Sequence, residues 1–374
     1  MRKKVLYFTN IPVPYRMDFF NELGKYCDLT VLMENEDVDN LNANWMKAHT
    51  VKNYTYILLP KIGKKSNTRI NYGYAKIVKE GNFDHIIVGT YYSLSAMVFI
   101  QFLRMNKIPF ILNSDGGFIK KDRAILKKIK THFISSAVHY ISTGVETSNY
   151  LIHYGAKKEE IYTIPFATLF EEDVLKNPVC SHDKIRIRNS LGIKEDKVLI
   201  YVGQFIHRKG VDNLLKALKL CPKEIGVYIV GGKVTEEYEK LALESENQNI
   251  HFIEFLGKKD LLEYYKAADI FVLPTREDIW GLVVNEAMSM GLPVISTKQC
   301  LAALELVDEG KNGWIYDAND WKKLAQIITE AFSEETVLEK MQFESLNTIK
   351  KYTIENMAIQ HIHIMDIIDG DMNE

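Results

Sequence analysis

Two carboxylates lie eight residues apart around a glycine, in a stretch where strand and helix patterns alternate. Asp278 follows an apolar run at residues 268–273 that has the length of a buried strand, and Glu286 lies about two turns into a segment with helical spacing. The first backbone N–H groups of that helix belong to Trp280, Gly281 and Leu282. A helix start has unpaired donors and a partial positive charge that suit a diphosphate, and carboxylates accept hydrogen bonds from sugar hydroxyls. The stretch therefore predicts a nucleotide-sugar site.

The two carboxylates also have a purely structural interpretation. An acidic residue near a helix start is often only a cap, and a glutamate on a helix is usually solvated. Glu286, however, is surrounded in the sequence by Leu282, Val283, Val284, Ala287 and Met288. A carboxylate without a partner is costly in such apolar surroundings, so we favour a binding role.

A second loop with suitable chemistry spans residues 203–210, after a strand pattern and before a leucine-rich helix. Its candidate residues are Gly203, Gln204, Arg208 and Lys209. A glycine-bearing loop with cations at a helix start holds phosphates through backbone donors and point charge. A solvated basic turn is the alternative interpretation, and we favour the phosphate-binding one.

The spacing Asp278-x7-Glu286, together with Gly281, resembles the E-x7-E motif of the retaining glycosyltransferases of family 4. The similarity continues downstream through residues 291–295 and 304–307. Members of this family have the two-domain GT-B fold, so the resemblance implies that fold for this chain.

Two positions depart from the family pattern. Asp278 stands where the family has its first glutamate, and the neighbouring Glu277 competes for that role. Gln204 stands where the family has an arginine, and Arg208 is the candidate that supplies the missing charge.

The resemblance also implies roles for the site residues. Glu286 would accept hydrogen bonds from the ribose, and Asp278 would contact the sugar. Lys209 would bind the departing phosphates together with the Gly281 and Leu282 amides. Further donor contacts are implied beside the nucleobase and in a downstream acidic segment, at Gly231, Leu256 and Glu305. For Glu305 a solvated surface position is an equal alternative.

Metal and cofactor chemistry is not expected from this sequence. We find no zinc-type cluster and no aspartate pair with metal-binding spacing, and the resembled family needs no metal. Lys209 and the helix start would neutralise the departing diphosphate instead.

The first half of the chain offers candidate acceptor contacts at the ends of predicted strands. These are Tyr15, Arg16 and Tyr91, although a tyrosine beside prolines is more often a packing residue. Many relatives place a histidine near residues 113–117, where this chain has none, so Asp115 is the candidate for the catalytic contact with the acceptor hydroxyl or donor sugar. We assign His132, His139 and His153 to structural or exposed positions.

Strand patterns alternate with helix patterns along the whole chain, which predicts parallel α/β sheets. We expect two doubly wound, Rossmann-like domains facing a cleft, with an acceptor domain at residues 1–180 and a donor domain at 181–353. A connection between the domains, without a clear strand, is expected at 165–197. A terminal helix at 354–368 would cross back to the first domain, as the resemblance implies. The predicted strands are 4–9, 28–33, 84–89, 108–113, 138–142, 161–165, 198–203, 225–230, 250–255, 269–273 and 293–297. In the first domain, one predicted helix follows the first strand and ends near Cys27. The other predicted helices span 70–80, 93–105, 122–134 and 144–154.

Charge is unevenly distributed along the 374 residues. Residues 1–180 carry 24 Lys and Arg against 17 Asp and Glu, which gives +7, although the whole chain has a net charge of −2. The segment 119–133 interleaves six cations with apolar residues at helical spacing, which fits a helix on an anionic membrane; a solvated face is an equal alternative. The near-neutral total and the lack of a nucleic-acid module argue against a nucleic-acid partner.

We therefore expect a cytoplasmic enzyme, peripheral at the inner face of the membrane. Its four cysteines form no C-x-x-C pair and are expected to be reduced thiols. It would move a sugar from a nucleoside-diphosphate donor, UDP-linked by expectation, to a saccharide or lipid-linked acceptor in bacterial surface polysaccharide synthesis. Two alternatives stay open: a non-catalytic sugar-nucleotide-binding subunit that needs a partner, and a sugar-nucleotide epimerase.

Overall fold

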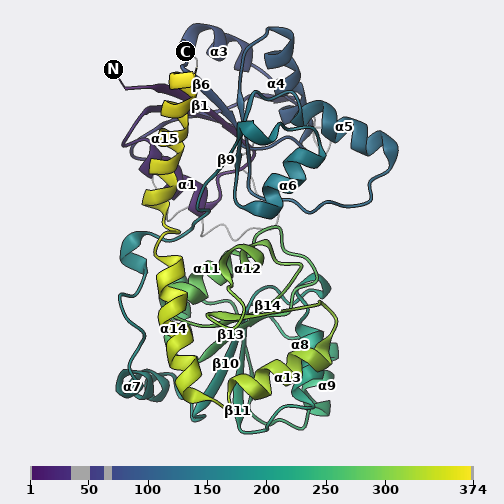
Figure 1. The fold of residues 1–374 in the computed structure, drawn as a ribbon, viewed down its shortest axis with the longest axis vertical. Coiled ribbons are helices and arrows are strands. Elements are labelled where there is room, and N and C mark those ends of the chain that lie inside the picture. Colours follow the sequence, from purple (N-terminus) through teal and green to yellow (C-terminus); the bar gives the residue numbers. More distant parts are fainter. Residues whose placement is uncertain (1, 35–50, 63–69, 372–374) are drawn as a thin grey trace. The chain divides into compact units, whose positions relative to one another are not determined.

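The computed structural model describes residues 2–34, 51–62 and 70–371 of the chain, which form two compact units (Figure 1). The first unit comprises Met1–Thr168 and Thr353–Glu374, and the second comprises Leu169–Tyr352. Each unit is built around its own parallel β-sheet with helices on both faces (Figure 1). The predicted α/β class with two doubly wound units is confirmed.

The first sheet has seven parallel strands in the order β3-β2-β1-β6-β7-β8-β9. Their bounds are β1 Lys4–Thr9, β2 Asp28–Met33, β3 Thr55–Leu58, β6 His85–Val88, β7 Ile111–Ser114, β8 His139–Ser142 and β9 Ile161–Thr163. Because helices cover both faces, the central strands are apolar on both sides, and every residue from Val5 to Thr9 is buried.

The helices of the first unit are α1 Pro14–Leu23, α3 Tyr74–Gly81, α4 Leu94–Met105, α5 Ala124–Ile134, α6 Val145–His153 and α15 Ile354–Asp371. The C-terminal helix α15 packs against α1, and Lys3 at the start of the chain forms an ion pair with Asp366 on α15 at 2.9 Å. The last helix thus belongs to the first unit although it follows the second unit in the sequence.

The second sheet has six parallel strands in the order β12-β11-β10-β13-β14-β15. The strands are β10 Lys197–Val202, β11 Ile225–Val230, β12 Ile250–Ile253, β13 Ile270–Leu273, β14 Val294–Thr297 and β15 Gly313–Tyr316. The helices are α7 Ser181–Leu191, α8 Val211–Leu218, α9 Glu236–Glu244, α10 Lys258–Ala267, α11 Leu282–Ser289, α12 Leu301–Leu306, α13 Trp321–Ala331 and α14 Glu335–Ile349.

The strand order reverses between β1 and β6 in the first sheet and between β10 and β13 in the second. In doubly wound sheets the loops at the carboxyl ends of such strand pairs diverge, which leaves room for a ligand. The loops that follow β10 and β13 are the two stretches that the sequence analysis selected.

The boundary between the units lies after Thr168 and not at residue 180, so the predicted division is corrected. The intervening segment is held by the second unit: Leu175 N–H donates to the Ser289 carbonyl at 3.0 Å, and Asp173 pairs with Lys258 at 2.8 Å. Polar contacts of this kind do not appear in the hydrophobic pattern of the sequence, so that pattern did not predict the boundary.

The connection predicted at 165–197 contains a helix that was not predicted, α7. Arg188 on α7 is buried and donates to the Ala267 carbonyl and to Asp269, both at 2.8 Å. Polar contacts therefore hold this helix in addition to apolar ones. Such contacts are not visible as an apolar stripe in the sequence.

Two helix bounds in the first unit differ from the prediction. The helix expected at 70–80 begins at Tyr74, because Ile70–Asn71 forms β5 and pairs with β4, Lys61–Ile62, before a turn at Gly73 with φ +89°. The first helix ends at Leu23 and not near Cys27, where the chain turns into β2.

The loop between β10 and α8 approaches the loop after β13 at backbone distance. Gly210 has φ +73°, and a Cβ atom at this position would lie 1.9 Å from the Pro274 carbonyl oxygen. The contact continues through Arg276, whose N–H donates to the Arg208 carbonyl at 2.8 Å. Only glycine fits at position 210, because the backbone conformation and the lack of space both exclude a side chain.

We expect Gly210→Ala to destabilise the second unit more than Gly192→Ala does. Gly192 has the same φ of +73° but nothing within 4 Å of its Cβ position, so its substitution costs only the left-handed backbone strain, on the order of 1–2 kcal/mol. Gly210→Ala adds the clash with Pro274 and should cost at least about 2 kcal/mol more. Urea unfolding of both variants measures this difference, and equal losses would contradict the close approach.

Candidate active site

The candidate site in the second unit lies at the carboxyl ends of β10 and β13, where the strand order reverses. The loop after β10 carries Arg208 and Lys209, and the loop after β13 carries Asp278. Because the two loops touch at Gly210 and Pro274, these charged side chains are brought together.

Arg276 fastens the two loops to each other. Its guanidinium binds both carboxylate oxygens of Asp212 at 2.7 Å and the His207 carbonyl at 2.7 Å. Burial alone would raise the pKa of Asp212, but the hydrogen bonds from Arg276 and Lys216 outweigh it and lower that pKa to about 2. The loops are thus joined by a bidentate charge-assisted pair that is intact throughout the neutral range.

Asp278 forms an ion pair with Lys209, and both side chains are largely buried, with 12% and 13% exposed. Arg208 lies farther away, with its Nη1 at 3.9 Å from the other Asp278 oxygen, and it donates to the Glu277 carbonyl at 2.7 Å. The structure therefore places Asp278 next to the predicted phosphate-binding lysine. The backbone carbonyl of Glu277, the residue before Asp278, faces Arg208.

Helix α11 begins beside this pair. Gly281 is its N-cap with φ +101°, and a Cβ atom there would lie 2.8 Å from Cys300 Sγ and 3.5 Å from an Asp278 oxygen. The helix start is therefore bare of side-chain atoms at the point where it meets Asp278. The Trp280 indole turns inward and donates to Asn285 at 2.9 Å, so it anchors the turn, and its ring is buried.

Glu286 lies on α11 and is half-buried. Tyr265 donates a hydrogen bond to its carboxyl at 3.3 Å. Burial raises the pKa of Glu286 to about 7, because the Tyr265 hydroxyl and the charge of Lys258 offset only part of the desolvation. The predicted ribose ligand is thus a carboxyl that is poorly solvated in the free protein and gains from hydroxyl donors.

The remaining donor candidates lie at the same carboxyl edge or on its flanks. Gly231 follows β11 with φ +145°, and a Cβ atom there would lie 2.1 Å from the Gly203 carbonyl, so these two backbones are in contact. Gln204 is exposed and accepts from Tyr201 through its carbonyl at 3.2 Å. Leu256 lies between β12 and α10, and Glu305 on α12 accepts from Tyr352 at 3.5 Å.

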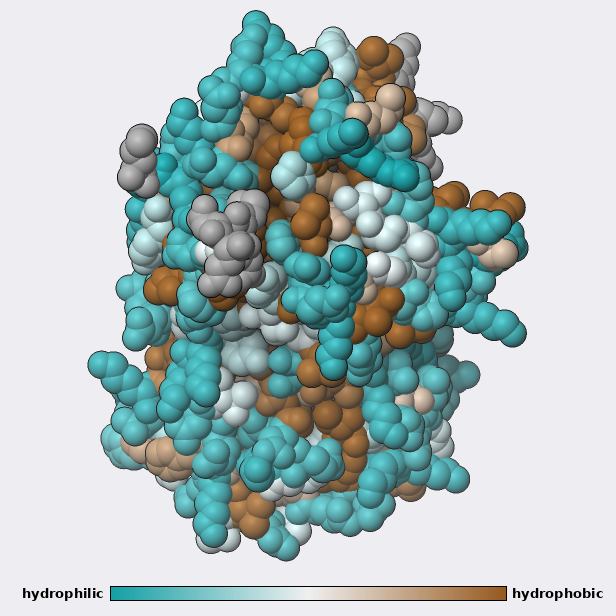
Figure 2. All heavy atoms as spheres, turned by 45° about the horizontal axis from the view of Figure 1, so that its top comes forward, coloured by the Kyte–Doolittle hydropathy of each residue, from teal (hydrophilic) through white to brown (hydrophobic). Residues whose placement is uncertain are grey.

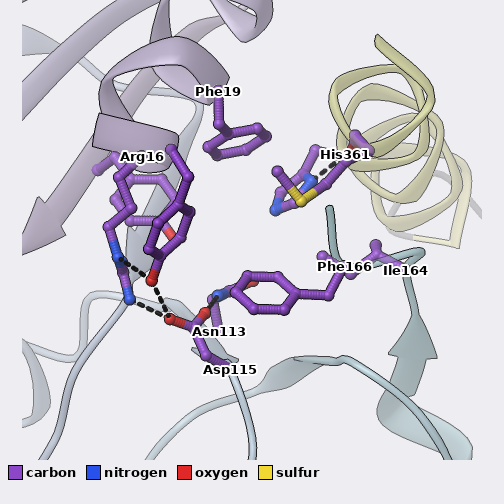
Figure 3. Close-up of a pocket in the computed structure, with 10 residues that line it drawn as sticks. Arg16, Phe19, Asn113, Asp115, Ile164, Phe166 and His361 are labelled. Carbon is purple, nitrogen blue, oxygen red and sulfur yellow. Dashed lines mark hydrogen bonds and ion pairs between the residues drawn. The ribbon is translucent and has the colours of Figure 1, made fainter. Parts of the chain in front are cut away.

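Of the four candidates in the first unit, Tyr15, Arg16 and Asp115 contact one another, and Figure 3 shows the Arg16–Asp115 pair. Arg16 forms an ion pair with Asp115, donates to Thr9 at 3.1 Å and contacts the Tyr15 hydroxyl at 3.4 Å. The fourth candidate, Tyr91, bonds to the hydroxyl of Tyr150. Asp115 is therefore a charge partner of Arg16, which the sequence did not indicate.

Sequence reasoning missed two residues that shape the second-unit site. Arg276 was treated only as part of a charged loop, and Tyr265 was not considered. A bidentate arginine has no local sequence signal, because its partner Asp212 is 64 residues away. The position of Tyr265 follows from packing of α10 beside α11, which no local pattern encodes.

The raised pKa of Glu286 predicts a pH-dependent gain in stability for Glu286→Gln. The folded protein holds the carboxyl proton up to a pH of about 7, whereas an unfolded glutamate releases it near its ordinary pKa of 4.5. The wild type therefore loses stability relative to the variant as pH rises from about 4.5 to 7. The variant should be as stable as wild type at pH 4 and more stable by on the order of 1–3 kcal/mol at pH 8.

Urea unfolding at both pH values measures this difference. Exposed Glu339 on α14 provides the control, because Glu339→Gln changes charge by the same amount without burial. A gain at pH 8 that is equal in the two variants would show that burial of Glu286 is not its cause.

Known proteins resemble this chain in both sequence and fold. Residues 183–354, nearly the whole second unit, match the family described as glycosyl transferases group 1. The lipopolysaccharide glucosyltransferase WaaG of Escherichia coli is 29% identical over 206 residues, which are 54% of this chain and 50% of that protein. An uncharacterized glycosyltransferase of Methanocaldococcus jannaschii is 26% identical over 62% of this chain and 64% of its own length. The matches thus span about half to two thirds of these relatives.

The fold extends the likeness to the whole chain. The structure of the HepE protein of Anabaena in complex with UDP superimposes with a TM-score of 0.78 and covers 97% of this chain and 99% of that one, at 16% identity. A structural likeness at such low sequence identity establishes the architecture of the chain but does not identify its substrate. The second unit thus matches the group 1 glycosyl transferases over residues 183–354, and the two units have the GT-B fold.

Proposed function

We propose that this chain is a retaining, metal-independent glycosyltransferase that moves a sugar from a nucleoside-diphosphate donor to a saccharide or lipid-linked acceptor. One observation carries the proposal. At the strand-order reversal of the second sheet, the buried Lys209–Asp278 pair lies against the bare start of α11, and Glu286 follows on the same helix. This arrangement offers a cation, helix amides and two carboxylates, which is the set that a diphosphate flanked by two sugars requires.

The charges fit the events at the donor. When the bond between the sugar C1 and the diphosphate oxygen breaks, the diphosphate leaves with the electron pair and gains negative charge. An ammonium group has three N–H donors, so Lys209 can keep Asp278 and bind a phosphate oxygen at the same time. Lys209, Arg208 and the amides of Gly281 and Leu282 would stabilise the departing charge, which removes the need for a metal.

The donor and acceptor classes rest on the relatives. The HepE structure contains UDP, and WaaG is named as a lipopolysaccharide glucosyltransferase. These names support a UDP-linked donor and an acceptor that belongs to a surface saccharide. The first unit, with Tyr15, Arg16, Tyr91 and Asp115, is the proposed acceptor side.

Slow donor hydrolysis tests the activity without knowledge of the acceptor. Purified protein is incubated with UDP-glucose, UDP-galactose, UDP-N-acetylglucosamine and GDP-mannose in excess chelator, and the release of nucleoside diphosphate and of free sugar is followed. Release from one donor supports the transferase. Binding without release indicates a non-catalytic subunit, conversion to another sugar nucleotide indicates an epimerase, and activity only after magnesium or manganese addition overturns metal independence.

We expect Glu286→Ala to weaken binding of the nucleoside diphosphate by about 1.5–3 kcal/mol, the usual worth of hydrogen bonds to a charged group. Calorimetric titration with UDP measures it, with Glu339→Ala as the matched control. Unchanged affinity in a folded Glu286→Ala protein would remove Glu286 from the nucleotide site.

We further propose that α5 and the residues before it dock on an anionic membrane. Four apolar side chains here are exposed, Ile119 at 50%, Ile125 at 75%, Leu126 at 45% and Ile129 at 38%, and within α5 only Ile134 is buried. In Figure 2 apolar side chains project between hydrophilic ones at the right-hand edge, where Figure 1 places α5. An ordinary core-packed helix would bury this face.

The cations around this face complete the argument. Five are exposed: Lys120, Lys121, Arg123, Lys127 and Lys128. Lys130, which the sequence analysis counted with them, is bound to Asp122 at 2.8 Å and is half-buried. None of the helices in residues 2–34, 51–62 and 70–371 is long and apolar enough to cross a bilayer. Attachment of this segment would therefore be peripheral and reversible.

Vesicle co-sedimentation tests the docking. Replacing Lys120, Lys121, Lys127 and Lys128 by Glu should lower binding to vesicles rich in phosphatidylglycerol at least tenfold, because each cation near the surface contributes about 1 kcal/mol. The control replaces Lys322, Lys323, Lys340 and Lys350 of the second unit by Glu, which changes net charge equally. If both variants bind like wild type, or if wild type does not bind, α5 is a solvated face.

A further inference from the structure

A small pocket in the first unit has a histidine from the C-terminal helix in its wall (Figure 3). The residues on which the argument depends are Arg16, Phe19, Asn113, Asp115, Phe166 and His361. The cavity measures about 10 Å³, which is room for one water-sized group. Figure 3 shows His361 facing this space from α15, with the Arg16–Asp115 pair on the opposite side.

The protonation of the His361 ring follows from its one hydrogen bond. The ring is 1% exposed, and its Nδ1 lies 2.8 Å from the Met357 carbonyl oxygen. A carbonyl only accepts, so Nδ1 carries the hydrogen, and Nε2 of the neutral ring is a bare acceptor. Burial lowers the pKa of His361 to about 4, so the ring stays neutral. Within the described part of the chain, Nε2 has no hydrogen-bond partner.

Asn113 provides a second acceptor in the same pocket. Its amide nitrogen donates to an Asp115 oxygen at 3.1 Å, and a carboxylate paired with Arg16 can only accept, which fixes the orientation of the amide. The amide oxygen of Asn113 therefore faces away from Asp115. It is buried and, like His361 Nε2, has no partner among the described residues.

Both unmatched atoms are acceptors, so the missing group is a hydrogen-bond donor. A metal ion is disfavoured, because the Arg16 guanidinium lines the same pocket and already neutralises Asp115. A neutral hydroxyl fits the cavity size, and its one hydrogen can serve one of the two acceptors. Buried acceptors left without a donor are rare in folded proteins. Phe19 and Phe166 are buried and close the rest of the pocket with apolar rings, so the pocket admits a single hydroxyl and not the sugar ring that carries it.

We propose that this pocket is a hydroxyl subsite for a saccharide, in which one sugar hydroxyl donates to His361 Nε2 and displaces a water that occupies the pocket in the free protein. His361 is then a specificity-determining residue for the acceptor. The proposal rests on the proposed function, because it places the acceptor on the first unit. It adds that the last helix of the chain takes part in recognising the acceptor.

Side-chain NMR of the full-length protein tests the subsite directly. The protein is labelled with ¹⁵N-histidine and titrated with the methyl glycosides of glucose, galactose, mannose and N-acetylglucosamine. With at least one glycoside, the His361 Nε2 resonance should shift saturably while Nδ1 keeps its proton. No shift with any of the four up to 50 mM overturns the proposal and leaves a water site only.

Two variants and a matched control separate recognition from folding. His361→Phe keeps a ring and removes the acceptor, so the affinity for the responding glycoside should fall at least tenfold, and His361→Gln, which restores an acceptor oxygen, should recover part of it. His363→Phe, on the exposed side of the same helix, should bind like wild type. Equal affinity in His361→Phe and wild type overturns the assignment.

UDP binding distinguishes this inference from the proposed function. Calorimetry with UDP reports on the second unit, so each variant should bind UDP as wild type does. If wild type binds UDP and no glycoside reaches His361, only the subsite falls. If wild type neither binds UDP nor hydrolyses a donor, the transferase proposal falls, whatever the glycosides do.

Discussion

The backbone contact between Gly210 and the Pro274 carbonyl is the constraint on which the candidate site depends. Parallel strands alone bring the ends of β10 and β13 to one edge, but they do not decide how near the following loops come. The missing side chain at position 210 allows the approach, and the Arg276–Asp212 pair holds it. Lys209 follows from this geometry: it directly precedes the contact and therefore meets Asp278, 69 residues further on.

Much of this architecture could be predicted because its signals lie in short stretches of the sequence. Short apolar runs with glycine and proline boundaries locate most strands within two or three residues, and the glycine-to-glutamate spacing locates the start of α11. Residue types and spacing also select Gly281, Lys209, Asp278 and Glu286 as candidate site residues. They lie in loops and helix starts whose conformation depends on neighbouring residues, and in parallel sheets the carboxyl ends of the strands share one edge by topology.

What could not be predicted depends on distant partners. Arg276 binds across 64 residues, Asp115 pairs with a residue 99 positions earlier, and His361 enters a pocket formed by the opposite end of the chain. Each sits in an unremarkable local pattern. Helix α7 was not predicted for a related reason. Hydrogen bonds from Arg188 help to hold it, and hydrophobic periodicity does not reveal such bonds. Sequence periodicity records burial of apolar area, whereas these contacts are specific and directional.

The two units share a way of holding charge before a ligand arrives. In each, a cation from the segment that follows a strand is paired with a carboxylate at the carboxyl edge of the sheet: Arg16 with Asp115, and Lys209 with Asp278. Partial burial makes the loss of either partner costly, because the other would remain charged and poorly solvated. Such pairs keep both side chains oriented, so that a ligand meets groups already in place and less entropy is lost on binding. The difference lies in the free donors. The guanidinium of Arg16 is distributed among Thr9, Tyr15 and Asp115, which favours a positioning role, whereas the Lys209 ammonium keeps donors that a phosphate can take.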